Sequence, residues 1–250
     1  MRKVLSFALA VLFVYAMAIT GRAEPALDAP NGQMSFTEIN LGGKEITIPV
    51  FSEVITATSN ARTGEQQEAG ELITLYLPVT DEGLAYNEEY LKTVKKQSRA
   101  SGTATDSYPD PNNYMVVTSY IRYTISGATC DGEWVDDFKV LITNVAITKD
   151  KSAESLGNGG YLIGISNPSA YVVCTGFDTV GSSESYNQTT TLSLAWSSSG
   201  MNTPSSWVPV VRYEYSDYCV TYARYSFSLT NNMDNGLETI PCTFTHTLSK

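Results

Sequence analysis

The chain has little basic charge and a single histidine. It carries 16 lysine and arginine residues against 26 aspartate and glutamate residues, which gives a formal net charge of −10. Proteins bind nucleic acid through clustered lysine and arginine, so this balance argues against a nucleic-acid partner. Any Ser-His-Asp or Cys-His mechanism would have to use His246. Cys-x-x-Cys pairs, glycine-rich phosphate loops and nucleophile elbows are also absent from the sequence.

Long apolar runs are missing except at the start of the chain. Arg2 and Lys3 precede an almost uninterrupted apolar run over residues 4–18, and small residues follow at plausible cleavage positions. This pattern predicts a signal peptide over residues 1–23, because the run is too short to span a bilayer comfortably. We therefore expect residues 24–250 to be secreted, extracellular and not inserted in a membrane.

Cysteine is absent from the first half of the chain. The four cysteines are Cys130, Cys174, Cys219 and Cys242. An even number in an oxidising compartment predicts disulfide bonds. Four cysteines allow three connectivities, and Cys130–Cys174 with Cys219–Cys242 is favoured because it closes the smallest loops.

The rest of the chain alternates strand-like runs with turn clusters. Residues 114–125 alternate apolar and polar with period two, and turn residues cluster at 158–160 and 234–236. About ten such runs predict an all-β fold, an antiparallel β-sandwich or jelly roll. At most one short surface helix is expected, around residues 87–99, with Asn87 as its N-cap.

Two strand-like segments resemble each other, residues 120–126 and residues 222–228. The similarity can mean two duplicated sandwiches that divide near residues 127–135, or the ordinary likeness of any two amphipathic strands. The flanking cysteines have no counterparts, so a single domain over residues 24–250 is the favoured interpretation.

These two segments also carry the candidate binding residues. Tyr120 and Arg122 share the polar side of one, and Tyr222 and Arg224 share the polar side of the other. Exposed tyrosine beside arginine is typical of carbohydrate-binding sheets and protein interfaces. We therefore expect a non-enzymatic binding or structural protein. Its Tyr-rich sheet face or loop edge would recognise a carbohydrate, a cell-surface component or a protein partner.

The alternative is a jelly-roll glycoside hydrolase, which needs two carboxylates and no histidine. Glu214 is the best strand-borne candidate, with Glu71 or Glu45 as its partner. His246 alternates with Phe244 on an apolar strand side, which favours a packing role over a catalytic one.

An acidic stretch directly follows Cys130. Its carboxylates, which could bind calcium in an extracellular β protein, are Asp131, Glu133, Asp136 and Asp137. The spacing lacks the pattern of an EF-hand loop, so solvated loop acids are the more economical explanation. No other cofactor is expected.

Overall fold

The structure, a computed structural model, describes residues 33–56, 67–79, 81–97, 114–130, 133–149, 162–178, 185–212, 219–233 and 236–248. The expected signal peptide at 1–23 lies outside these residues. No helix within the described ranges is long and apolar enough to cross a membrane.

The described chain is antiparallel β-structure with one helix, which confirms the all-β prediction. The elements are β1 (Gln33–Leu41), β2 (Lys44–Thr56), β3 (Gln67–Pro78), α2 (Asp81–Gln97), β4 (Tyr114–Cys130), β5 (Glu133–Lys149), β6 (Leu162–Ile165), β7 (Ser169–Phe177), β8 (Ser185–Ser193), β9 (Ser197–Asn202), β10 (Val210–Val211), β11 (Val220–Met233) and β12 (Gly236–Thr247).

All twelve strands belong to one sheet. Its order is β10-β5-β4-β3-β2-β1-β12-β11-β7-β8, with β6 beside β11 and β9 beside β5. The sheet curls until β10 touches β7, so it is nearly closed into a barrel. This order does not establish the expected sandwich or jelly roll. Around the possible division near residues 127–135, β4 ends at Cys130 and β5 begins at Glu133, and these two residues pair with each other. The strands before and after this point lie in the same sheet.

The core fills the inside of the curled sheet. Along β4, Met115, Val117, Ser119 and Ile121 are fully buried, while the alternate side chains of Val116, Thr118 and Tyr120 are partly exposed. The period-two alternation seen in the sequence therefore separates the core from the surface. Tyr225 of β11 crosses this interior and its hydroxyl donates a 2.9 Å hydrogen bond to the carbonyl of Tyr120, which ties opposite walls together.

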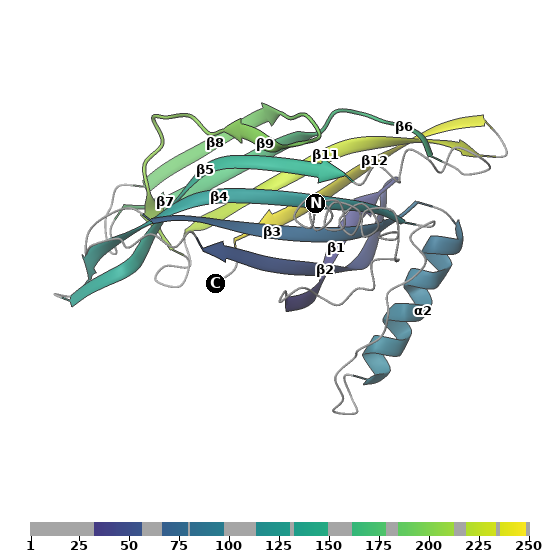
Figure 1. Cartoon of the computed structure of the whole chain (residues 1–250), viewed down its shortest axis with the longest axis horizontal. Coiled ribbons are helices and arrows are strands. Elements are labelled where there is room, and N and C mark those ends of the chain that lie inside the picture. Colours follow the sequence, from purple (N-terminus) through teal and green to yellow (C-terminus); the bar gives the residue numbers. More distant parts are fainter. Residues whose placement is uncertain are drawn as a thin grey trace, which may run out of the picture.

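The helix α2 begins six residues before the predicted segment and projects away from the sheet (Figure 1). Asn87 is consequently not the N-cap. It lies inside the helix, is buried, and its side-chain amide donates a 2.9 Å hydrogen bond to the carbonyl of Thr47 in β2. The amide that the sequence suggested for a cap instead anchors the helix to the sheet.

The disulfide prediction is wrong for three of the four cysteines. Cys174, Cys219 and Cys242 are buried free thiols. Cys242 lies opposite Phe227, eight residues along β11 from Cys219, or roughly 26 Å in an extended strand. The favoured Cys219–Cys242 bond is therefore impossible. The side chain of Cys130 is not described, but the predicted Cys130–Cys174 bond is absent because Cys174 is a free thiol.

The side chain of Gln188 links the two ends of the sheet, β8 and the segment before β10, at the seam where they approach each other. Gln188 of β8 is buried, and its amide nitrogen donates to the carbonyls of Cys174 (3.0 Å) and Val208 (2.8 Å). Its oxygen accepts a 2.6 Å hydrogen bond from the Val208 amide. The Gln188 side chain thus binds both the amide and the carbonyl of Val208, in the connection between β9 and β10, as the backbone of a neighbouring strand would.

Candidate functional site

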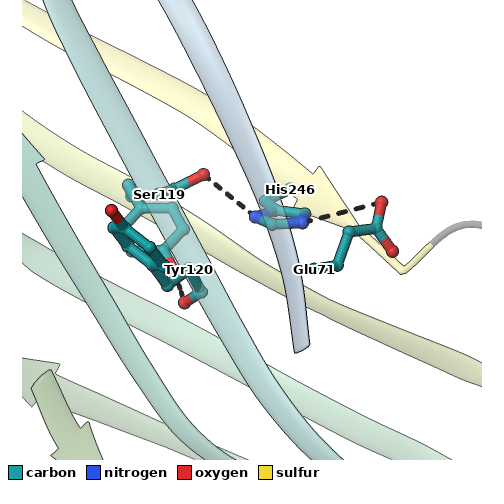
Figure 2. A network of polar contacts seen from close by, with 5 residues as sticks. Glu71, Ser119, Tyr120 and His246 are labelled. Atoms are coloured by element: carbon teal, nitrogen blue, oxygen red, sulfur yellow. Dashed lines mark hydrogen bonds and ion pairs between the residues drawn. The ribbon is translucent and has the colours of Figure 1, made fainter. Parts of the chain in front are cut away.

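Three polar side chains meet in the interior of the curled sheet (Figure 2). Ser119 of β4 and His246 of β12 are fully buried, and Glu71 of β3 is 3% exposed. The hydroxyl of Ser119 lies 2.9 Å from Nδ1 of His246, and Oε1 of Glu71 lies 3.8 Å from Nε2. Residues from three strands therefore form one buried polar cluster, with His246 at its centre.

The environment of His246 disfavours its charged form. Burial lowers the pKa of the imidazole, and the nearby carboxyl of Glu71 acts in the opposite direction. Nε2 is buried and has no hydrogen-bond partner, because the carboxylate is too far away for a hydrogen bond. The buried imidazole therefore has a hydrogen-bond partner at Nδ1 and none at Nε2.

The cluster has the residue types of a hydrolytic triad, but its serine and histidine are not accessible to a substrate. A nucleophilic serine must reach substrate, and Ser119 has no exposed surface. The arrangement acts as an internal polar contact between β4 and β12. The sequence correctly placed His246 on the core side of its strand, although its partners come from strands far away in the sequence and were missed.

The outer surface of four adjacent strands, β8, β7, β11 and β12, is rich in hydroxyl groups. We call it the hydroxyl face. Arg224 is the only charged residue among its described members, which are Ser185, Asn187, Thr189, Thr191, Ser193, Ser169, Tyr171, Val173, Thr175, Val220, Tyr222, Arg224, Ser226, Thr243, Thr245 and Thr247. Val220 is exposed, and Val173 lies directly opposite Tyr222. A face without a single carboxylate is unusual for a chain with 26 acidic residues.

Aromatic and cationic groups gather near the middle of the hydroxyl face. Arg224 lies directly opposite Tyr171 in the β7–β11 pair and opposite Thr245 in the β11–β12 pair. Its guanidinium carbon lies 5.9 Å from the ring centre of Tyr222, within the range of a cation–π interaction. Tyr171 is 40% exposed. The group offers rigid aromatic surface beside five potential hydrogen-bond donors of one arginine.

The other predicted pair does not belong to this face. Tyr120 and Arg122 lie on the outside of β4, and four strands separate β4 from β11 in the sheet order. Arg122 donates hydrogen bonds to Asn144 (3.2 Å) and to the carbonyl of Ser198 (2.9 Å). Its guanidinium therefore braces β4 against β5 and β9. The four residues predicted as one binding site therefore lie at two separate places on the sheet.

Beside Tyr120 and Arg122 is a small depression of about 250 Å³ in the outer surface. It is open above Gly70, where β3 has no side chain, and Ile55 and Glu68 form its other walls. A pocket for a drug-sized ligand is usually about 300–1,000 Å³. The depression is therefore smaller than a typical small-molecule site.

Of the acidic side chains predicted to bind calcium, the structure describes only that of Glu133. Glu133 is exposed at the start of β5, Asp131 lies outside the described residues, and the side chains of Asp136 and Asp137 are not described. The described part of the chain contains no group of three His, Cys, Asp or Glu side chains suited to a metal. The calcium site stays a prediction.

The structure does not test the carboxylates of the hydrolase alternative, because its main candidate is not described. Glu214 lies in the undescribed residues 213–218, Glu45 is exposed on β2, and Glu71 is buried beside His246. The comparisons give no independent indication: no protein-family model, curated protein or solved structure matches the chain.

Proposed function

We propose that this protein is a secreted, non-enzymatic binding protein whose hydroxyl face recognises a neutral carbohydrate. The observation that carries the proposal is the composition of that face: hydroxyl groups predominate around Tyr171, Tyr222 and Arg224, and its described members include no carboxylate or lysine. Secretion rests on the expected signal peptide.

The chemistry of the face suits a sugar better than a charged polymer. Tyrosine presents an apolar ring that can lie against the C–H side of a sugar ring, together with a hydroxyl for hydrogen bonding. Serine, threonine and asparagine supply adaptable donors and acceptors, as they do in antibody combining sites. A polyanion would require clustered cations, and this face has a single one.

A glycan-array screen of residues 24–250 tests the proposal. Specific binding is expected, and Tyr222→Ala or Arg224→Ala should weaken it by about tenfold or more if these residues anchor the ligand. Tyr120→Ala is the matched control, because it removes an outward tyrosine from β4, which lies away from the hydroxyl face in the sheet order.

Two results would overturn the proposal. A blank array would show that neutral glycans are not the ligand, and binding that depends on Tyr120 but not Tyr222 would place the site elsewhere. The same preparations should be assayed for new reducing ends from polysaccharides. Their release, lost in Glu214→Gln, would replace the proposal with the glycoside hydrolase alternative.

A further inference from the structure

The second edge of strand β8 has no strand partner among the described residues. The strand ends the sheet order, runs for nine residues and pairs only with β7. The other strands with a single described partner, β6, β9 and β10, are four, six and two residues long. Exposed edges usually carry charges, prolines or bulges that prevent pairing with another chain. β8 has no charged residue or proline, and its register with β7 is unbroken.

The order of apolar and polar residues along β8 is the same in both directions from its central residue, Thr189. We propose that β8 pairs antiparallel with β8 of a second copy about a two-fold axis at Thr189. Tyr186 would then face Leu192 on the core side of the sheet, and Asn187 would face Thr191 on the outer side. Ser185 would meet Ser193, Gln188 would meet Thr190, and Thr189 would meet itself. Each apolar residue is thus opposite an apolar one, and each polar residue opposite a polar one.

Partial burial of the apolar pair supports this register. Tyr186 and Leu192 both pack on the core but are only partly buried in one molecule. Pairing across the axis would remove further apolar surface from water on the side of the sheet where both already lie.

Charge also favours this place of contact. Each molecule has a formal net charge of −10, so two copies repel each other over most approaches. β8 and the adjoining hydroxyl face contain no carboxylate. Two copies that meet at β8 therefore bring no acidic side chains of these strands together. The pairing would continue the hydroxyl face across both molecules, whatever that face binds.

Analytical ultracentrifugation of the purified protein over micromolar to millimolar concentrations tests the pairing. A monomer–dimer equilibrium is expected. Thr189→Lys places two lysines opposite each other at the axis and should raise the dimer dissociation constant by about fivefold or more. Thr189→Glu should do the same. An equimolar mixture of the two variants should dimerise at least as well as the unmodified protein, because the opposing charges then attract.

Thr191→Lys is the matched control, on the same strand and face but opposite Asn187 rather than itself. It should leave the dissociation constant nearly unchanged. Circular dichroism of each variant checks that the fold is retained. A protein that stays monomeric at every concentration, a dimer insensitive to charge at Thr189, or a mixture that fails to restore association would each overturn the proposal.

Discussion

His246 should make the stability of the protein depend on pH in a window that no other side chain normally occupies. It is the only histidine, and ordinary carboxyl pKa values lie well below this window. Burial lowers its pKa in the folded protein from the ordinary 6.5. The unfolded chain therefore binds a proton that the folded chain does not, and stability is full above about pH 6.5 and falls below it.

The size of this loss follows from the structure. The imidazole has no exposed surface, and Nδ1 is already engaged with Ser119. If the folded imidazole stays neutral, the free energy of unfolding falls by about 1.4 kcal/mol per pH unit below the unfolded pKa. Between about pH 7.5 and pH 5 the loss reaches ~2 kcal/mol, and any proton shared with Glu71 would reduce it.

Urea denaturation at several pH values, on protein without a histidine tag, measures this dependence. His246→Gln should flatten the curve in this window, whereas Ser119→Ala keeps the imidazole and should keep the slope. The single set of imidazole NMR signals gives a direct second measurement. Equal slopes for the unmodified protein and His246→Gln, or an imidazole that titrates at or above its ordinary pKa, would refute the reasoning.

Four further predictions concern particular residues. Gln188→Ala should cost about 1–3 kcal/mol in urea denaturation, because it leaves buried backbone groups at the seam without partners; an unchanged midpoint would contradict this role. Gly200→Ala should cost more than about 1 kcal/mol by thermal unfolding, since Gly200 has φ +62° and an added Cβ would overlap the Val145 carbonyl; equal melting temperatures would speak against it. Burial raises the pKa of Cys174 to about 11 and of Cys242 to about 12. Both thiols should therefore resist alkylation at about pH 8 in the folded protein and react fully in denaturant without reductant; failure to react there would indicate disulfides. Millimolar calcium should leave the melting temperature unchanged; an increase that is lost in Asp136→Asn would instead favour a calcium site in residues 131–137.

Sequence patterns predicted the strands best where one side is buried and the other is not. The alternation along residues 114–125 identified β4 and its inward side correctly, because burial of one face imposes period two. Apolar residues do not mark strands where the chain is irregular. Val210–Val211 form a strand of only two residues, and the nearby Trp207 packs on the core from outside any strand.

The candidate sites were harder to predict because they depend on which strands become neighbours. Tyr222 and Arg224 were selected correctly as an outward pair, but nothing local in the sequence shows that β7 and β12 bring hydroxyl groups to both sides of them. Tyr120 and Arg122 show the same local pattern, yet the sheet order puts them elsewhere. Glu71 and Ser119 lie on the paired strands β3 and β4, but His246 of β12 reaches them only because the sheet curls.

The place of β12 in the sheet bears on how the protein is made. This strand, the last described in the chain, lies between β1 and β11 and so joins the earliest described strand to the later ones. A nascent or truncated chain without it would expose two unpaired edges, one on each half of the sheet. Folding to the final topology must wait until the C-terminal residues are available, and pairing over such a sequence separation is slow. Incomplete chains should consequently be sensitive to proteases and prone to aggregate, so synthesis and quality control are coupled through the final strand.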